Sequence, residues 1–385
     1  MRNILTLVLT LALTLVPGVS QAGPRARDLG VPFDGEPGPF NAITDVAGVT
    51  VGQVTLIEDL DGGKKVRTGV TAVLPRGRDS LDLHAFGAWF ALNGAGELTG
   101  TTWLEESGEL EGPVLLTNTH SVGIVHDAAI AWRVRQGKPD PTGYWWSSAV
   151  VGETWDGHLN DINGFHVRAE HVDRALGKAA PGPVAEGNVG AGTGTICYEF
   201  KCGIGTASRS VRLDGREHIV GVLVQANNGR RDDLRIAGAP IGQHLREHRV
   251  YSMDDDTAGE TGSIIIVIAT DAPLLPHQLK RLVKRAALGL ARTGSTAGNG
   301  SGDIFIAFST ANAAALRGAP LALAEVMPNS GLDNLFRATV QATEEAIVNA
   351  MVAARDMEGT EGRYAKALPH ADLVALLKHY GRLVR

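Results

Sequence analysis

The step from Gly262 to Ser263 joins two stretches of opposite character. Residues 254–256, shortly before it, are three consecutive aspartates in a polar segment, a composition that stays in water. Residues 264–268 after it are Ile, Ile, Ile, Val and Ile, which is typical of a buried strand. The Ser263 hydroxyl is therefore expected at the mouth of a core strand, beside a loop that would tolerate cleavage. This placement suits a nucleophile, although a turn glycine before an ordinary serine gives the same pattern.

A second polar cluster, residues 298–303, also stands directly before a strand-like run, residues 304–308. The cluster contains Ser301 and Asp303, a hydroxyl and a carboxylate two positions apart. If both strands begin at the same edge of a sheet, the sequence predicts that Ser263 and Ser301 lie close together.

A third candidate is Asn227, which ends the apolar run 221–226 and is followed by an Asn-Gly turn. A carboxamide N–H at the end of a core strand is a candidate oxyanion donor, a role that contributes about 3 kcal/mol to a transition state. The alternative is an asparagine that only caps a turn.

The carboxylate of Glu153 is followed by the indole of Trp155. Such a pair can hold a cationic amine, with the aromatic ring as a cation–π wall. The alternative for Glu153 is a surface ion pair. His120 and His126 have no serine partner in a recognisable motif, and we interpret both as structural.

The chain has 2 cysteines, Cys197 and Cys202. They cannot complete a tetrahedral metal site alone, and no histidine cluster at ligand spacing accompanies them. A disulfide forms if the segment bends into a hairpin. If the segment is one straight strand, the two side chains point to opposite faces and cannot meet.

Periodicity predicts the elements that must position these residues. Strands flanked by helices suggest one α/β domain in which helices cover stacked sheets. Besides the strands named above, the predicted elements are strands at 45–56 and 69–75 with a turn at 61–63, and helices at 277–292, 332–351 and 371–383.

Composition and the first residues indicate an exported globular protein. The 385 residues include 48 Gly and are 44% hydrophobic but only 20% charged, so a large core can form. The net charge of -6 argues against a nucleic-acid or anionic-membrane partner. Residues 1–22 have the pattern of a signal peptide cleaved near Ala22, which predicts a periplasmic or secreted protein. An uncleaved anchor is the alternative reading.

With these residues in place, the sequence resembles the self-processing N-terminal-nucleophile aminopeptidases, which include L-aminopeptidase/D-amidase/esterases and β-peptidyl aminopeptidases. The similar blocks keep the family's order over nearly the whole chain after residue 22. They include ITDVAGVTVGQVTL, GVTAVLP, LNGAGELTG, LLTNTHSVGIV, VVGETWDGHLNDING, GNVGAGTGT, FKCGIGTASR, VLVQAN and SGDIFIAFSTAN.

The resemblance implies an αββα sandwich that cuts itself between Gly262 and Ser263. The products would be an α chain, residues 23–262, and a β chain, residues 263–385, which stay associated and form a homo-oligomer, a tetramer of α/β pairs. Ser263 would be the catalytic nucleophile, activated by its own freed amine without metal or cofactor. The resemblance also implies that Asn227 is the oxyanion donor and that Ser301 and Asp303 hydrogen-bond the amine and hydroxyl of Ser263. Glu153 and Trp155 would bind the substrate.

The implied activity is a serine aminopeptidase or amidase that releases N-terminal residues from short peptides, amides or esters through a Ser263 acyl-enzyme. L-α, D-α and β-amino N-termini all stay open as substrates. The related ornithine acetyltransferases would have Thr at the nucleophile position, where this chain has Ser263. An alternative from another class is an exported amine- or peptide-binding protein of the same fold, which would stay uncut.

Overall fold

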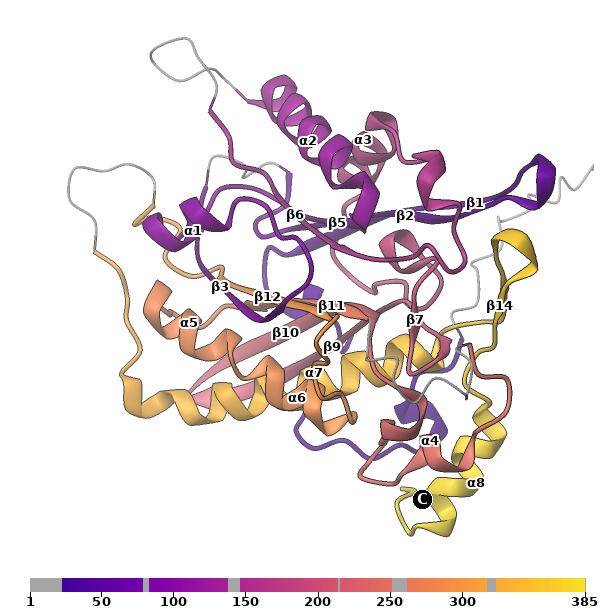
Figure 1. Ribbon diagram of the computed structural model, residues 1–385. Coiled ribbons are helices and arrows are strands. Elements are labelled where there is room, and N and C mark those ends of the chain that lie inside the picture. Colours follow the sequence, from indigo (N-terminus) through magenta and orange to yellow (C-terminus); the bar gives the residue numbers. More distant parts are fainter. Residues whose placement is uncertain are drawn as a thin grey trace, which may run out of the picture.

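Two β-sheets lie face to face between two layers of helices in the computed structural model (Figure 1). The structure describes residues 23–78, 83–137, 146–213, 215–250, 262–316 and 323–384. This four-layer αββα arrangement confirms the fold expected from the sequence. The predicted signal peptide and the acidic segment before Gly262 lie outside the described residues.

The larger sheet places Ser263 at the start of a central strand. Its order is β4-β3-β12-β11-β10-β9. Strand β11 runs antiparallel to β10 and parallel to β12, so the start of β11 lies beside the end of β10 and the start of β12. The bounds are β3 (Ala85–Gly94), β4 (Glu109–Leu110), β9 (Ile204–Leu213), β10 (Arg216–Asn227), β11 (Ser263–Thr270) and β12 (Gly302–Ser309).

The smaller sheet has the order β1-β2-β5-β6 and carries Glu153. Strands β1 and β2 form a long antiparallel hairpin, whereas β5 and β6 are parallel. The bounds are β1 (Thr50–Asp59), β2 (Lys65–Leu74), β5 (Val114–Asn118) and β6 (Val150–Thr154). Two short hairpins lie outside both sheets. They are formed by β7 (Ile196–Cys197) with β8 (Phe200–Lys201), and by β13 (Met357–Glu358) with β14 (Tyr364–Ala365).

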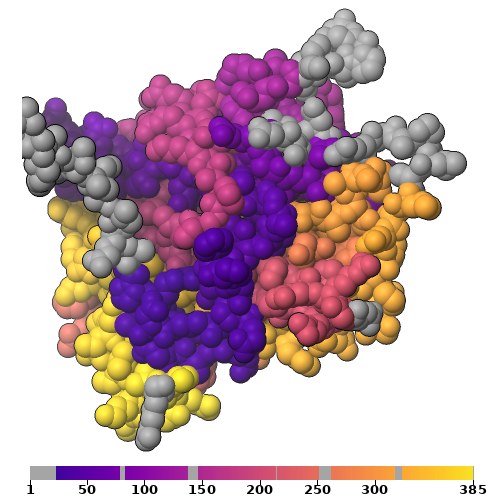
Figure 2. Space-filling model, turned by 180° about the vertical axis from the view of Figure 1, so that it is seen from behind, coloured from indigo at the N-terminus to yellow at the C-terminus, as the bar shows by residue number. Residues whose placement is uncertain are grey.

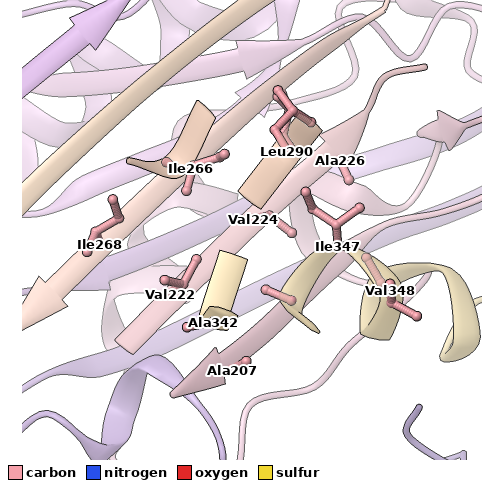
Figure 3. Packing of buried hydrophobic residues seen from close by; sticks show 14 of the residues in the cluster. Ala207, Val222, Val224, Ala226, Ile266, Ile268, Leu290, Ala342, Ile347 and Val348 are labelled. Carbon is pink, nitrogen blue, oxygen red and sulfur yellow. The ribbon is translucent and has the colours of Figure 1, made fainter. Parts of the chain in front are cut away.

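Helices cover the outer faces of both sheets (Figure 1). On the larger sheet, Ala342, Ile347 and Val348 of the long helix that begins at Leu332 pack against Val222 and Val224 of β10 (Figure 3). The smaller sheet is covered by α2 (Val122–Gln136) and α3 (Ala169–Gly177), and the larger by α5 (Pro276–Val283), α6 (Ala286–Arg292) and α7 (Leu332–Val352), while α1 (Thr101–Ser107), α4 (Ile241–His244) and α8 (His370–His379) lie nearer the edges.

The inner faces of the two sheets form a second core that fixes how β6 lies over β11. A Cβ atom built on Gly152 would stand 3.2 Å from both branches of the Ile265 side chain, so these strands are in close contact. Gln225 reaches across the same interface, and its Nε2 donates to Thr117 O and Thr154 Oγ1, each at 2.8 Å. A buried amide with partners on the other sheet sets the relative position of the sheets.

Several predicted elements differ in extent from those observed; β2, for example, begins at Lys65 instead of residue 69 and β10 at Arg216 instead of residue 221. The predicted helix 277–292 is two helices, because α5 packs on the sheet strands β3 and β12 whereas α6 packs on α7, so the chain must change direction between them. The first predicted strand begins at Thr50 instead of residue 45, because the left-handed Gly48 precedes it with a φ of 90°. The last helix ends at His379, before Gly381.

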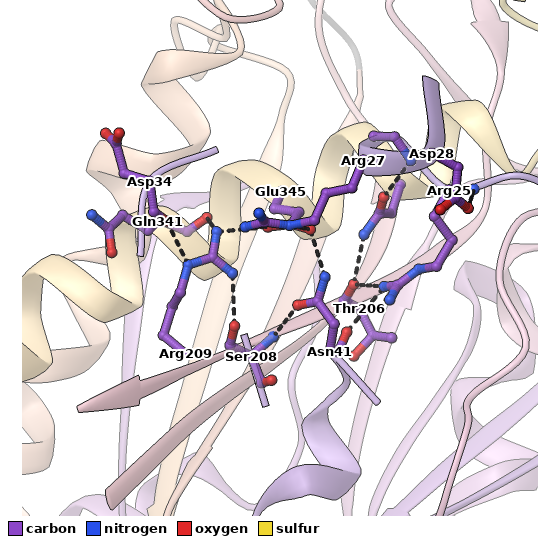
Figure 4. Close-up of polar contacts among 12 residues, drawn as sticks. Arg25, Arg27, Asp28, Asp34, Asn41, Thr206, Ser208, Arg209, Gln341 and Glu345 are labelled. Carbon is purple, nitrogen blue, oxygen red and sulfur yellow. Dashed lines mark hydrogen bonds and ion pairs between the residues drawn. The ribbon is translucent and has the colours of Figure 1, made fainter. Parts of the chain in front are cut away.

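A buried charge network ties the N-terminal residues to the rest of the molecule (Figure 4). The fully buried Glu345 of α7 accepts bonds from Arg27 at 2.7 and 2.8 Å, Arg209 at 2.6 Å and Asn41 at 2.6 Å. These partners hold the pKa of Glu345 below its ordinary value, although burial alone would raise it. Figure 2 shows the N-terminal residues, in indigo, lying against the magenta and yellow parts of the surface.

Within the described residues, no helix is long and apolar enough to cross a membrane. The same part of the chain contains no group of three or more His, Cys, Asp or Glu side chains that could hold a metal ion.

Candidate active site

Strand pairing brings four of the predicted residues to one end of β11. Ser263, the first residue of β11, stands opposite Asn227 of β10 and is aligned with Gly302 of β12. Side chains directly opposite each other in an antiparallel pair lie on the same face of the sheet. Gly302 separates Ser301 from Asp303, so the predicted Ser-x-Asp pair flanks the position aligned with Ser263.

Ser263 is turned back toward the peptide bond that precedes it. Its Oγ donates to Gly262 O at 2.8 Å, and the Gly302 N–H donates to Ser263 Oγ at 3.3 Å and to Gly262 O at 3.1 Å. The Ser263 residue is buried. A Cβ atom on Gly262 would stand 2.4 Å from Asn227 O and 2.7 Å from Asn228 Cα, so only glycine fits without a shift of backbone.

Asn227 has a defined amide orientation. Its Oδ1 accepts the backbone N–H of Ile196 at 2.9 Å. Because the carboxamide oxygen is used by this contact, the Nδ2 group is the part available to an acceptor elsewhere. Asn227 can therefore act as a donor, which is the property an oxyanion site requires.

Ser301 and Asp303 form a buried pair. Ser301 Oγ donates to Asp303 Oδ1 at 2.7 Å, and both residues are fully buried. The loop that carries them is held by Asn93, whose Nδ2 donates to Ala297 O at 3.1 Å and also to Gly298 O. A fixed hydroxyl and carboxylate beside the start of β11 can accept protons or orient an amine there.

Glu153 approaches the same region from the other sheet. A Cβ atom built on Gly96 would stand 3.2 Å from Glu153 Oε1 and 3.2 Å from Gly302 Cα, so the loop at Gly96 lies between the carboxylate and the Ser263 strand edge. Oε1 accepts the Glu97 N–H at 2.9 Å, and Oε2 accepts the Thr119 hydroxyl. The residue is 3% exposed, which removes the surface-ion-pair interpretation.

Burial raises the pKa of Glu153, while hydrogen bonds from Thr119 and the Glu97 backbone, and the nearby His120, act in the opposite direction. None of the salt bridges seen in the described residues includes Glu153. A nearby cation would stabilise the charged form of this buried carboxylate.

Trp155 and the two histidines are the remaining candidates from the sequence. The Trp155 indole is 40% exposed and covers Gly157, where a Cβ atom would stand 2.7 Å from the ring. The ring of His120 stacks on Phe165 with centroids 6.1 Å apart. No hydrogen bond or ring contact found among the described residues joins His120 or His126 to Ser263, and the structural role of both stays a prediction.

Sequence reasoning missed two buried charged groups beside the site. Burial raises the pKa of Asp156 to about 7, and burial lowers the pKa of Lys201 well below its ordinary value. The Lys201 ammonium donates to three backbone carbonyls, those of Gly192, Thr195 and Cys202. No motif distinguishes these residues from surface charges, because their burial depends on how the loops fold over β10.

The two cysteines form a disulfide with an S–S distance of 2.02 Å, and all cysteines in the described residues are thereby paired. They close the β7–β8 hairpin, in which Cys197 pairs with Phe200. The hairpin interpretation is therefore confirmed and the straight-strand interpretation was wrong.

Comparison with known proteins identifies the family of the chain. The pattern of peptidase family S58 matches residues 41–365. The chain is 55% identical over 383 residues to the β-peptidyl aminopeptidase BapA of Sphingosinicella microcystinivorans, with 96% of each chain covered. It is 46% identical to BapA of Sphingosinicella xenopeptidilytica, covering 97% of this chain and 96% of that one. The structure of the L-aminopeptidase D-Ala-esterase/amidase of Ochrobactrum anthropi, described as a variant of the Ntn hydrolase fold, superposes with a TM-score of 0.87 and 49% identity, covering 94% of this chain and 100% of that one.

The chain belongs to peptidase family S58. It is a hydrolase that acts on peptide bonds, an aminopeptidase or amidase with an Ntn-hydrolase fold. The family expected from the sequence is confirmed, and a non-catalytic binding protein is not favoured.

Proposed function

We propose that the chain cleaves itself between Gly262 and Ser263 and that Ser263 then serves as an N-terminal nucleophile. The observation that carries this proposal is the contact between Ser263 Oγ and Gly262 O, with Gly302 N–H donating to both oxygens. Attack of Oγ on the Gly262 carbonyl carbon forms an ester as the C–N bond breaks and the nitrogen takes the proton. Water then hydrolyses the ester and frees the Ser263 amine.

The freed amine has the pKa of an ordinary α-amino group, near 8, and acts as general base for its own hydroxyl. Ser301 and Asp303 are the groups placed to hydrogen-bond this amine and hydroxyl. Asn227 Nδ2 donates to the oxyanion that forms when Ser263 attacks a substrate carbonyl. No metal ion and no cofactor takes part in this sequence of steps.

Glu153 binds the free amine of the substrate as a carboxylate–ammonium pair. The buried position of Glu153 supports this role, because burial strengthens its interaction with a single matching cation. Trp155 contributes an aromatic wall over the amine. The preferred substrates are therefore short peptides, amides or esters with an unblocked N-terminus.

We propose β-amino N-termini among the accepted substrates. Two relatives at 55% and 46% identity are named β-peptidyl aminopeptidases, and that similarity supports the assignment. Hydrolysis of three amides that differ only in an L-α, D-α or β-amino N-terminus would rank the preferences directly.

The proposed α chain, residues 23–262, and β chain, residues 263–385, remain together after cleavage. Strand β11 lies between strands β10 and β12, and Glu345 of the later segment binds Arg27 and Arg209 of the earlier one. We also propose that such α/β pairs assemble into a homo-oligomer, a tetramer of pairs. Residues 1–22 are removed when the protein is exported to the periplasm or the medium.

Hydrolysis of a chromogenic aminoacyl amide by wild type and by Ser263→Ala tests the mechanism, with a chelator added in parallel. We expect Ser263→Ala to lose activity and the chelator to leave wild-type activity unchanged. Activity that survives Ser263→Ala, or that the chelator abolishes, contradicts the proposal.

A further inference from the structure

The orientation of Asn227 depends on a segment that the proposed reaction does not use. Ile196, which donates to Asn227 Oδ1 at 2.9 Å, is the first residue of the β7–β8 hairpin. The Cys197–Cys202 disulfide closes that hairpin one residue later. The Ile196 N–H is therefore held by a covalent loop and is directed at the side chain of the proposed oxyanion donor.

The hairpin is fixed to the strand that carries Asn227 on both sides of that residue. Ala226 N donates to Gly203 O at 3.0 Å, and Tyr198 N donates to Asn228 O at 2.7 Å. A change in the position of the hairpin would consequently move the end of β10 as well as the donor to Asn227.

The turn of the hairpin stores backbone strain. Tyr198 and Glu199 have φ values of 51° and 60°, a left-handed conformation that L-residues other than glycine rarely adopt. Arg231 binds both carbonyls, Nε to Tyr198 O at 2.8 Å and Nη2 to Glu199 O at 2.6 Å. Two strained residues persist only where the surroundings over-determine them, and the disulfide spans both.

Lys201 stabilises the base of the same hairpin. Its ammonium donates to Thr195 O at 2.8 Å, and Cys202 N donates to the same carbonyl at 3.1 Å. Thr195 immediately precedes Ile196, so these contacts restrict the peptide unit that presents the Ile196 N–H. The N–H is thus held from the Thr195 side by hydrogen bonds and from the Cys197 side by the disulfide.

We infer that the Cys197–Cys202 disulfide is a positioning element of the active site, which holds the Ile196 N–H so that it turns the Asn227 carboxamide into its donating orientation. This inference rests on the proposed role of Asn227. Without the disulfide, relaxation of the strained turn would move the Ile196 N–H, and the carboxamide would lose its fixed orientation. The consequence is slower chemistry with little change in substrate binding.

A double-mutant cycle tests the inference with wild type, Cys197→Ala/Cys202→Ala, Asn227→Ala and the triple variant. Intact mass gives the fraction cleaved at Gly262, and kcat is referred to cleaved protein. In the wild-type background, loss of the disulfide should lower kcat about 10- to 100-fold with KM nearly unchanged. In the Asn227→Ala background, the same change should alter kcat by less than about twofold, because the group being positioned is gone.

Self-cleavage passes through an oxyanion at Gly262, so its rate is a second readout of the same cycle. Equal effects of the cysteine replacement in both backgrounds, or full kcat without the disulfide, would overturn the inference. An active Asn227→Ala enzyme would instead contradict the proposed role of Asn227. If Asn227→Ala loses activity while the cysteine variant keeps full activity, the positioning role of the hairpin is contradicted and the proposed role of Asn227 stands.

A second variant covers the case in which the protein without cysteines does not fold. Ile196→Pro removes the N–H that Asn227 accepts and keeps the disulfide, while Ile196→Val keeps both and serves as the matched control. We expect kcat to fall about 10-fold or more in Ile196→Pro and to stay near wild type in Ile196→Val. Equal kcat in the two variants would overturn the inference.

Discussion

Asn227 and Ser263 stand directly opposite each other across the antiparallel β10–β11 ladder. One residue ends its strand and the other begins its strand, so a donor and a hydroxyl share one end of a six-stranded sheet. Because both are anchored by backbone pairing, their relative position is set by the sheet itself. This relationship is the geometric basis of the proposed acyl transfer.

Replacement of Asn227 by Asp should remove the oxyanion donor while leaving the acceptor that Ile196 uses. An anionic group would then face the developing negative charge. We expect kcat to fall about 10²- to 10³-fold with a small change in KM. Steady-state kinetics on cleaved protein measures this, and an unchanged kcat would show that Asn227 does not contact the oxyanion.

Replacement of Glu153 by Gln keeps the shape of the side chain and removes its charge. We expect kcat/KM for substrates with a free amine to fall about 10²-fold, mainly through KM, because the ammonium loses its buried partner. Glu97→Gln is the matched control, since it removes the charge of an exposed neighbour and keeps the backbone N–H that Glu97 donates to Glu153. Similar losses in both variants would argue against amine recognition by Glu153.

The acidic limb of the pH profile should report Glu153. Binding of the ammonium needs the carboxylate form, and burial raises the pKa of Glu153. The value of kcat/KM should therefore fall with decreasing pH at a higher pH than an ordinary glutamate would give. The Ser263 amine, whose pKa is near 8, gives this limb a first protonation step at higher pH. In Glu153→Gln the second step should disappear while the step of the amine remains, and a second step that persists in that variant would assign it to another group.

Gly262→Ala should slow self-cleavage, because its Cβ atom would stand 2.4 Å from Asn227 O. The backbone must shift, and the Ser263 hydroxyl then loses its alignment with the Gly262 carbonyl. We expect the rate of cleavage to fall about 10²-fold. Gly94→Ala is the control, because nothing lies within 4 Å of a Cβ atom there; equal cleavage rates in the two variants would contradict the geometric argument.

Glu345→Gln should destabilise the fold by about 3–5 kcal/mol, because Arg27 and the buried Arg209 lose their anionic partner. Glu344→Gln is the neighbouring control, since it removes only a pair with the half-exposed Arg292 and should cost at most about 1 kcal/mol. Denaturant unfolding of both variants measures the difference. Equal midpoints would show that the network adds little to stability.

The sequence allowed the meeting of Ser263, Ser301 and Asp303 at one end of the sheet to be predicted because its signals are local. The apolar run after Ser263 and the polar cluster before residue 304 each determine where a strand begins, and the parallel β11–β12 pair then aligns them. Glu153 was ambiguous because its burial depends on the loop at Gly96 from another part of the chain. The residues alone suggested amine binding but left a surface ion pair open, and the family resemblance implied the amine-binding role.

Other features could not be predicted because they depend on tertiary packing. Whether Cys197 and Cys202 meet is decided by a turn with two residues at positive φ, for which the sequence has no glycine signal. The burial of Asp156 and Lys201 likewise follows from loops that fold over them. The break between α5 and α6 depends on which layers those helices contact.

Intact mass and denaturing gel analysis of the purified protein, wild type beside Ser263→Ala, tests the central claim most directly. We expect two fragments in the wild type, divided between Gly262 and Ser263, and one continuous chain in Ser263→Ala. A single uncut chain in a wild type that still hydrolyses substrate, or cleavage that persists in Ser263→Ala, would contradict an N-terminal Ser263 nucleophile.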